Sequence, residues 1–468
     1  MLYVQKSVHP PRSRLPEDIV LAHLPSRTSP ICLVEPHISA ILRNMKYRTR
    51  VVDALLDGML TELPAVAIEG AKGVGKTATA SRRARTVLTL SDPRARSSVA
   101  ANYDLITQVP APVLIDEWQL EPSVWERVRA AVDQDPLAGA RFLLAGSAGV
   151  SSDVRLHSGA GRIVRLLLRP MALSERGLDT GSSISLAALH SGHASIEGAC
   201  PLDLPDYVDE ILRSGLPGIR DLSDANRGRQ LDGYITRIIE HDMPDNGMTV
   251  RRPAALRAWM RAYAAATAST ASYTTILDAA TATQPDKPAR ATIDLYREHL
   301  TRLFILDPLE SWAPTFAPLK NLVGAPKHHL VDPALAARLV GVGKQGLLQG
   351  DGQQVPPTTS TWLGALFESL AVQSVRVYAE AFGAHVGHLR TKRGEHEVDI
   401  IVETPDTRAT ALEVKLADTV RDRDVRHLTW LRDRLGDRLM DAVVLYTGPY
   451  AYRRPDGVAV VPLALLGP

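Results

Sequence analysis

One short stretch constrains the fold of this chain more than any other. Residues Gly70–Thr77 read Gly-Ala-Lys-Gly-Val-Gly-Lys-Thr and follow the apolar run Val66–Ile68. The glycines let the backbone curl so that successive N–H groups point at a triphosphate. Lys76 then reaches the β and γ phosphates, and the Thr77 hydroxyl ligates Mg²⁺. We therefore expect ATP and Mg²⁺ as cofactors. The expected nucleotide contacts are Gly70, Ala71, Lys72, Gly73, Val74, Gly75, Lys76, Thr77 and Ala78.

A helix should follow this loop, because Ala80, Ala84, Val87 and Leu88 recur at helical spacing. The N-terminus of such a helix favours a bound anion. The alternative is a chance glycine-rich turn. A strand, a Lys-Thr pair and a helical pattern in register favour the phosphate-binding loop.

A second apolar run ends in two acids. Residues Pro112–Ile115 precede Asp116 and Glu117, which is typical of a strand buried on both faces of a parallel sheet. We expect Asp116 to hold the Mg²⁺ shell and Glu117 to orient and deprotonate the attacking water. In the alternative interpretation, the two acids only cap the next helix. The phosphate-binding loop nearby favours the catalytic interpretation.

A third strand is predicted at Phe142–Ser147, which places Ser147 at its carboxyl end. Ligands of such sheets bind at this edge, so Ser147 is a candidate γ-phosphate sensor, with a small turn residue as the competing interpretation. Arg155 and Arg162 then flank a glycine-bearing turn before the alternating run Ile163–Leu168. Arg162 is a candidate to neutralise charge on the γ-phosphate, in cis or across a subunit interface. The alternative is an ordinary surface arginine.

Further acids carry a pattern in the C-terminal part. Glu368 is surrounded by apolar residues at helical offsets, and a buried carboxylate is costly unless it is paired or metal-bound. Two alternating runs predict strands that bring Asp399, Glu413 and Lys415 together. The spacing Glu…Asp-x13-Glu-x-Lys is that of the PD-(D/E)xK nuclease superfamily.

The chemistry of such a site explains these residue types. Asp399 and Glu413 would hold Mg²⁺, which polarises a phosphate and activates water, and Glu368 would add or support a ligand. Lys415 would orient or activate the water. Arg390, Lys392 and Arg393 could meet a nucleic-acid backbone. Active cleavage and a binding or degenerate role both remain open.

Several motifs together resemble one protein family. These motifs are, in chain order, Gly70–Thr77, Leu114–Gln119, Leu144–Ala148, His157–Arg162 and Leu168–Glu175. With them the chain is similar to the bacterial and archaeal AAA-type ATPases that carry a C-terminal domain of unknown function. The resemblance covers about residue 45 to the end, and it implies ATP use, a winged-helix segment and a restriction-endonuclease-like domain.

Bulk composition excludes some classes of function. The chain has 468 residues, 45% apolar and 23% charged, which is ordinary for a globular protein of several domains. A net charge of +2 gives no global nucleic-acid footprint. Cys32 and Cys200 supply neither a disulfide framework nor a zinc cluster. Without a membrane-spanning run or a signal sequence, we expect a cytoplasmic protein.

These observations predict an α/β protein with two candidate functions. One is an ATPase that controls a Mg²⁺-dependent nuclease acting on nucleic acid, with a homo-oligomer as the hypothesis in which Arg162 acts across a subunit interface. The other is an ATP-switched binding or scaffold protein with an inactive nuclease fold. The predicted parts are 1–44 (an extension, disordered or from a misassigned start), 45–177 (AAA-type ATPase), 178–340 (connector and winged-helix-like helices), 341–360 (linker) and 361–468 (nuclease-like).

Overall fold

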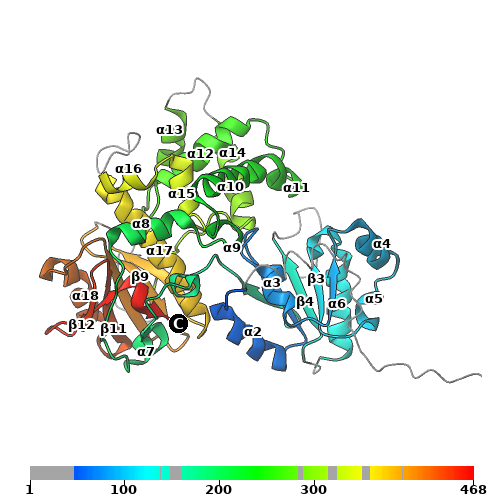
Figure 1. Cartoon of the computed structure of the whole chain (residues 1–468), viewed down its shortest axis with the longest axis horizontal. Helices are drawn as coiled ribbons and strands as arrows, with labels where there is room; N and C mark the ends of the chain where they lie inside the picture. Colours follow the sequence, from blue (N-terminus) through cyan, green and yellow to red (C-terminus); the bar gives the residue numbers. More distant parts are fainter. Residues whose placement is uncertain are drawn as a thin grey trace, which may run out of the picture. The chain divides into compact units, whose positions relative to one another are not determined.

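The computed structural model describes residues 47–136, 139–147, 160–282, 288–314, 324–349, 359–392 and 394–468. The predicted extension 1–44 and the candidates Arg155 and Arg393 lie outside these residues, as do residues 350–358 of the predicted linker 341–360. Figure 1 shows the chain coloured by sequence, with its helices and strands labelled.

The predicted parallel sheet is confirmed in the first half. Five strands lie in the order β2-β3-β4-β1-β5, and every pair is parallel. Strands β3 and β4 are buried along their whole length, as their uninterrupted apolar sequences predict. The strands are β1 (Ala65–Glu69), β2 (Thr86–Thr89), β3 (Val113–Asp116), β4 (Phe142–Gly146) and β5 (Val164–Leu167).

Alternate residues of these strands enter two different cores. Val66 and Leu143 pack with helices α2 (Val51–Glu62) and α3 (Lys76–Ser81). Their neighbours in sequence pack with α6 on the other face, together with residues of α4 and α5. The sheet is therefore covered on both faces, and the carboxyl ends of its strands meet at one edge (Figure 1). These three helices are α4 (Pro93–Ala101), α5 (Leu105–Gln108) and α6 (Ser123–Gln134).

The helix after the loop is shorter than we predicted. It ends at Ser81, and Val87 and Leu88 belong to β2, the strand at one edge of the sheet. Burial alternates along this strand, and its β-branched residues favour an extended chain. A few apolar residues fit both the helical and the strand period, so their spacing alone could not separate the two.

Helices dominate the middle of the chain, as the sequence predicted. After α14, the described residues 302–314 and 324–332 carry isolated antiparallel bridges, Leu306 to Leu330 and Leu309 to Lys327. A winged helix remains a prediction. The helices are α8 (Leu204–Arg213), α9 (Pro217–Arg220), α10 (Asp224–Arg237), the π-helical turn η3 (Ile238–Asp242), α11 (Met243–Asp245), α12 (Pro253–Ala265), α13 (Tyr273–Thr281), α14 (Arg290–Arg302), α15 (Pro333–Val340) and α16 (Lys344–Gln349).

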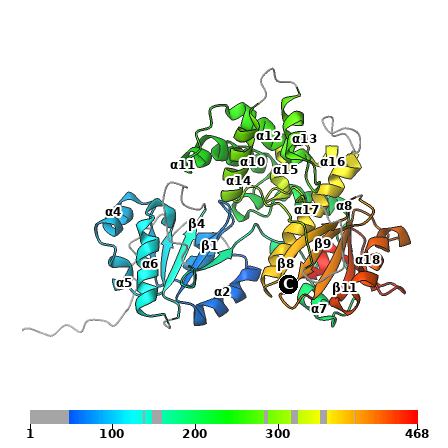
Figure 2. The same ribbon diagram turned by 180° about the vertical axis from the view of Figure 1, so that it is seen from behind.

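The C-terminal part contains a seven-stranded sheet in the order β7-β12-β13-β11-β10-β9-β8. Strands β8, β9 and β10 are antiparallel, and β10, β11 and β13 are parallel. Figure 2 labels β8, β9 and β11 of this sheet. The helix predicted around Glu368 and the two strands predicted to carry Asp399 and Glu413 are present, as α17 (Thr359–Glu380), β9 (Glu397–Glu403) and β10 (Ala409–Lys415). The other elements of this part are β8 (His385–Arg390), α18 (Asp422–Leu435), β11 (Leu439–Tyr446), β12 (Tyr450–Arg453) and β13 (Ala459–Pro462).

Residues 178–200 differ from the predicted loose connector. Strand β6 (Ile184–Ser185) pairs with β14 (Leu466–Gly467), and β7 (Gly198–Ala199) pairs with β12. Helix α7 (Leu186–Ser191) lies between them and packs on α17 and β11. Through β7 this segment supplies an edge strand of the seven-stranded sheet, and β6 and β14 form a separate two-stranded sheet. The sequence did not predict these strands, because strands of two residues in a segment rich in Gly, Ser and His give no recognisable apolar pattern.

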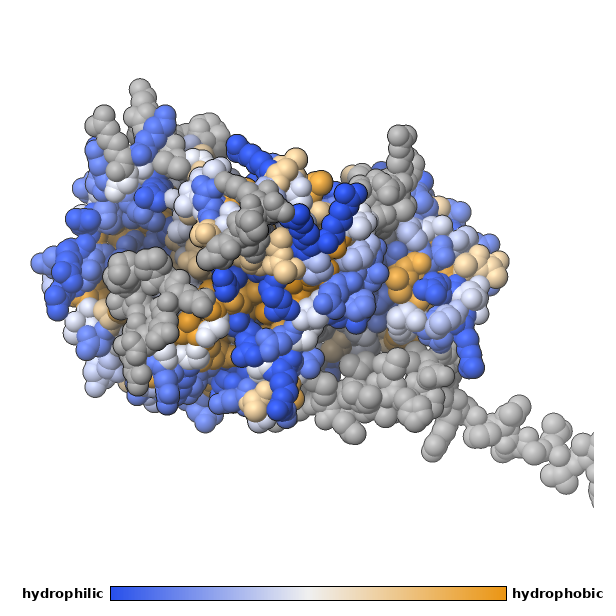
Figure 3. Space-filling model, turned by 90° about the horizontal axis from the view of Figure 1, so that it is seen from above, coloured by the Kyte–Doolittle hydropathy of each residue, from blue (hydrophilic) through white to orange (hydrophobic). Residues whose placement is uncertain are grey.

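No helix among the described residues is long and apolar enough to cross a membrane. Among the exposed large apolar side chains of the described residues, Tyr450 and Tyr452 share strand β12, and the others lie on separate elements. Polar residues dominate the face in Figure 3.

Candidate functional site

Glycines determine the path of the loop that follows β1. Gly70 has φ +147°, and a Cβ there would lie 2.2 Å from the carbonyl oxygen of Leu168. Gly75 has φ +104° and immediately precedes α3. Residues with side chains rarely adopt these conformations, so substitution would displace the loop. The loop therefore delivers Lys76, Thr77 and Ala78 into the first turn of α3.

Thr77 and Asp116 meet at the carboxyl end of β3. The Thr77 hydroxyl donates a hydrogen bond of 2.9 Å to Asp116 Oδ1. Lys76 Nζ donates to the carbonyl oxygens of Gly70 and Ala71, both at 2.9 Å. Burial lowers the pKa of Lys76 to about 8 and raises the pKa of Asp116 to about 6. A hydroxyl and a carboxylate in contact are ligands that suit Mg²⁺, so these two residues fit the expected ion.

Glu117 lies beside Asp116 in a left-handed backbone conformation, with φ 54°. Its carboxylate accepts hydrogen bonds from the Gln119 amide and, at 3.5 Å, from the Ser147 hydroxyl. Ser147 follows β4 directly, at the edge where it was expected. The structure therefore brings Glu117 and Ser147 together, and Ser147 as a phosphate sensor remains a prediction.

Arg162 lies at the amino-terminal ends of the strands, opposite the carboxyl ends where the loop lies. It precedes β5, whose Val164 pairs with Val66 near the beginning of β1, whereas the loop follows the end of β1. Its guanidinium forms a 2.8 Å ion pair with Asp133 at the end of α6. Within one chain it does not reach the loop. A role across a subunit interface remains a prediction.

Arg50 supports the loop, and the sequence did not reveal it. Its guanidinium donates to the carbonyl oxygens of Val74 (2.9 Å) and Arg169 (2.8 Å). It also forms a buried ion pair of 3.1 Å with Glu175. The signal in the sequence was absent, because Arg50 lies outside the motif and its partners are distant along the chain.

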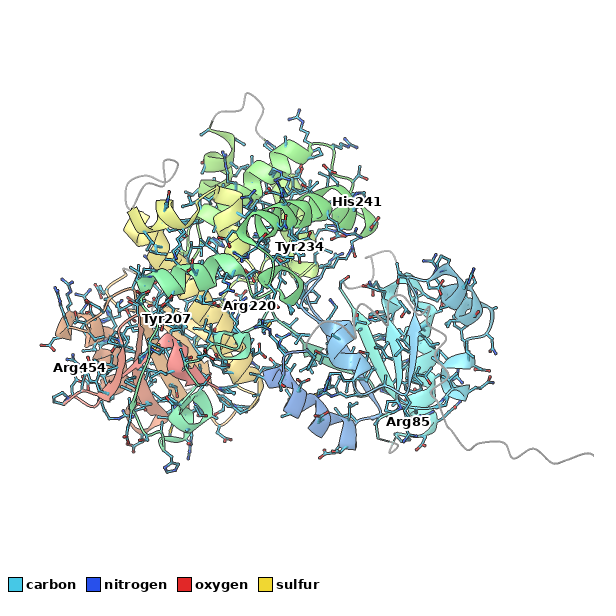
Figure 4. The ribbon with its side chains drawn as sticks, viewed as in Figure 1. Arg85, Tyr207, Arg220, Tyr234, His241 and Arg454 are labelled. Carbon is cyan, nitrogen blue, oxygen red and sulfur yellow. The ribbon has the colours of Figure 1, made fainter. Side chains whose placement is uncertain are left out.

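The middle helices also contact the loop. Lys72 Nζ pairs with the Asp242 carboxylate of η3, and the Tyr234 hydroxyl of α10 donates a 3.0 Å hydrogen bond to the Lys72 carbonyl oxygen. Figure 4 labels Tyr234 and His241, the neighbour of Asp242. Lys72 is thus held at its side chain and at its backbone by residues more than a hundred positions away.

In the C-terminal sheet, β9 and β10 bring three predicted residues together. Asp399 Oδ2 accepts a 2.9 Å hydrogen bond from the backbone N–H of Val414, next to Glu413. Lys415 Nζ lies 2.6 Å from Glu413 Oε1. Burial and the charge of Asp399 raise the pKa of Glu413 to about 8. Within the described part of the chain, the second oxygen of Glu413 is buried without a hydrogen-bond partner.

Lys327 joins this cluster, and the sequence did not single it out. Its Nζ lies 2.8 Å from Glu368 Oε1, 2.8 Å from Asp399 Oδ1 and 3.1 Å from Glu397 Oε1. Burial alone would lower the pKa of Lys327, but the three carboxylates outweigh burial and hold it well above its usual value. Burial raises the pKa of Glu368 to about 8 despite the neighbouring ammonium.

Glu368, Asp399 and Glu413 do not form a metal cage as they stand. The described residues contain no group of three or more His, Cys, Asp or Glu side chains arranged to hold an ion. The ammonium of Lys327 lies where two of the predicted ligands converge. The metal roles of these three acids and the water-activating role of Lys415 remain predictions.

Comparison with protein families separates the chain into three matched regions. Residues 62–176 match the family described as AAA domain. We refer to residues 62–176 as the AAA domain because of this match. Residues 204–346 and 363–466 each match a domain of unknown function, DUF8612 and DUF4143 respectively. The AAA domain contains the loop, Asp116, Glu117, Ser147 and Arg162, and the middle match contains Tyr234 and Asp242.

Similar proteins extend the comparison to most of the chain. Two uncharacterized proteins, Rv2008c of Mycobacterium tuberculosis and Mb2031c of Mycobacterium bovis, are each 26% identical over 443 residues, 89% of this chain and 84% of their own. Among solved structures, a Walker-type ATPase of Pyrococcus abyssi has a TM-score of 0.36 at 15% identity, covering 64% of this chain and 99% of its own. The ORC2 protein of Aeropyrum pernix has a TM-score of 0.25 at 15% identity, covering 67% and 93%.

Proposed function

We propose that this chain binds and hydrolyses ATP with Mg²⁺ and passes its nucleotide state to the middle helices. The observation that carries the proposal is the contact of the Thr77 hydroxyl with Asp116, at 2.9 Å, beside the buried Lys76 of the AAA domain. These are the groups that hold the metal and the phosphates of a nucleoside triphosphate.

Each residue has a separate task in hydrolysis. Thr77 and Asp116 would hold Mg²⁺, which neutralises charge between the β and γ phosphates. Lys76 exchanges the carbonyl oxygens of Gly70 and Ala71 for phosphate oxygens. Glu117 accepts the proton of the attacking water, and its hydrogen bonds from Gln119 and Ser147 hold the carboxylate in position.

Lys72 connects the nucleotide to the middle helices. Its ammonium pairs with Asp242, and a triphosphate in the loop competes with that carboxylate for the same cation. Tyr234 holds the Lys72 backbone from α10. ATP binding therefore weakens the Lys72–Asp242 pair and leaves the Asp242 carboxylate of η3 without its ammonium partner.

Phosphate release tests this proposal. The wild-type chain should hydrolyse ATP only with Mg²⁺, and Lys76→Ala should lose hydrolysis and ATP binding while remaining folded. Lys344→Ala is the matched control, because Lys344 forms an ion pair with Asp209 on α8, outside the AAA domain. Full activity in Lys76→Ala would refute the assignment of the loop.

For the C-terminal part, we propose a binding or scaffold role controlled by ATP rather than cleavage of nucleic acid. The observation that favours it is the ammonium of Lys327 between the carboxylates of Glu368 and Asp399. A panel of DNA and RNA substrates with Mg²⁺ or Mn²⁺, with and without ATP, separates the two roles. Cleavage that is lost in Asp399→Ala would restore the predicted nuclease.

A further inference from the structure

The carboxylates of the C-terminal sheet already share one cation. Lys327 is almost completely buried, with 1% of its side chain exposed. Its ammonium contacts one oxygen each from α17 (Glu368) and β9 (Glu397 and Asp399), at 2.8–3.1 Å. A buried ammonium is stable only when such partners compensate its charge.

The backbone holds Lys327 in this position. Lys327 and Leu309 exchange two hydrogen bonds, N–H to carbonyl oxygen in both directions, each 2.9 Å long. The neighbouring His328 N–H donates to the Ser269 carbonyl oxygen at 2.9 Å. The ammonium is therefore delivered by a paired segment that belongs to the middle of the chain, not by a freely rotating surface lysine.

The same oxygens would be needed for a divalent ion. An ion that binds Glu368 Oε1 and Asp399 Oδ1 would compete with Lys327 Nζ for these two oxygens, since both are 2.8 Å from that nitrogen. Two cations cannot share this buried space, because their repulsion is strong at low dielectric. The second oxygen of Glu413, next to Asp399, has no hydrogen-bond partner within the described residues.

We infer that Lys327 is the resident cation of this cluster and excludes divalent metal from it. The cluster becomes a divalent-cation site only when Lys327 is removed or withdrawn. The inference does not depend on ATP hydrolysis, because it concerns charges outside the AAA domain. It goes beyond the proposed function by identifying what occupies the cluster.

Mn²⁺ titration of the full chain, monitored by the electron paramagnetic resonance of free Mn²⁺, tests the inference without nucleotide. Every protein in this titration, including the one with Lys327 intact, also carries Asp116→Asn. This removes the carboxylate that would hold Mn²⁺ in the AAA domain. With Lys327 intact, no tight equivalent should bind. Adding Lys327→Met should create one equivalent, and adding Asp399→Asn to that variant should remove it. Lys344→Met, which removes a lysine that pairs with Asp209 away from the cluster, should create none.

The chain with Lys327 intact decides the question even if Lys327→Met does not fold. One tight Mn²⁺ bound to that chain and lost with Asp399→Asn overturns the inference. Failure of folded Lys327→Met to gain an equivalent overturns it too. Thermal melting gives a second readout: Mg²⁺ should raise the Tm of Lys327→Met and leave the Tm of the intact chain unchanged. Because no ATP is present, these results are independent of the hydrolysis assay.

Discussion

The Thr77 hydroxyl donates to Asp116 Oδ1 at 2.9 Å, which joins two motifs that lie 39 residues apart in the chain. The pair exists because β1 and β3 are parallel strands of one sheet, separated by β4, and both end at the same edge. A loop that follows β1 and an acid that ends β3 therefore converge without any further element.

Thr77→Val should impair hydrolysis, because it keeps the shape of the side chain and removes the hydroxyl that contacts Asp116. Losing a hydrogen bond to a charged group costs about 1.5–3 kcal/mol, which corresponds to roughly a 10- to 100-fold lower rate. Thr77→Ser retains the hydroxyl and should stay close to wild type. Steady-state phosphate release at saturating Mg²⁺ measures both variants, and equal rates for Val and Ser would contradict this role.

Asp242→Asn should tighten ATP binding. The substitution removes the carboxylate that competes with phosphate for Lys72. If breaking the Lys72–Asp242 pair costs roughly 1 kcal/mol of binding free energy, the variant should have a several-fold lower Kd for ATP. Titration of the variant with a fluorescent ATP analogue measures the change. Arg257→Ala is a matched control, because Arg257 contacts Thr236 on α10 without touching the loop. Weaker ATP binding in Asp242→Asn would argue against the competition.

Asp307 makes stability depend on pH. Its carboxylate pairs with Arg169 at 2.9 Å and with Arg376 at 2.7 Å, and although burial opposes ionisation, the two guanidinium groups hold its pKa well below the usual value. A lowered pKa gives stability that is present above the unfolded pKa of about 3.9 and is lost as the pH falls below it.

Asp307→Asn should therefore lower the free energy of unfolding at pH 7. We expect about 2–3 kcal/mol, less than for a completely buried pair because Asp307 is partly exposed. The difference from wild type should shrink as the pH approaches 4 and below. Urea unfolding at both pH values measures it, and a difference that grows in acid would have the wrong sign.

Arg162 can act on ATP only from a neighbouring subunit. If it does, Arg162→Ala should bind ATP normally but hydrolyse it slowly. Mixing Arg162→Ala with Lys76→Ala should restore part of the activity, because one subunit then supplies the loop and the other the arginine. Mass measurement with and without ATP must show an oligomer. A strict monomer in both states would eliminate this role.

Local motifs were predictable, and long-range partners were not. The loop, Asp116 and Glu117 are recognisable because their chemistry needs particular residues at short spacing. Lys327 was not, because it meets Glu368 and Asp399 from 41 and 72 residues away, and nothing in its own neighbourhood marks a buried lysine. Glu368 did carry a signal: an acid on an apolar helical face requires a partner, and the structure shows the Lys327 ammonium in that position.

The Glu117→Gln variant tests the proposed ATP hydrolysis most directly. This substitution keeps the size of the side chain and removes the base, so the variant should bind Mg²⁺ and ATP with a wild-type Kd while its hydrolysis rate falls about 100-fold or more. ATP binding and single-turnover hydrolysis should be measured on the same preparation. Retained binding with lost hydrolysis supports an ATPase built on Glu117. Hydrolysis at the wild-type rate would contradict it.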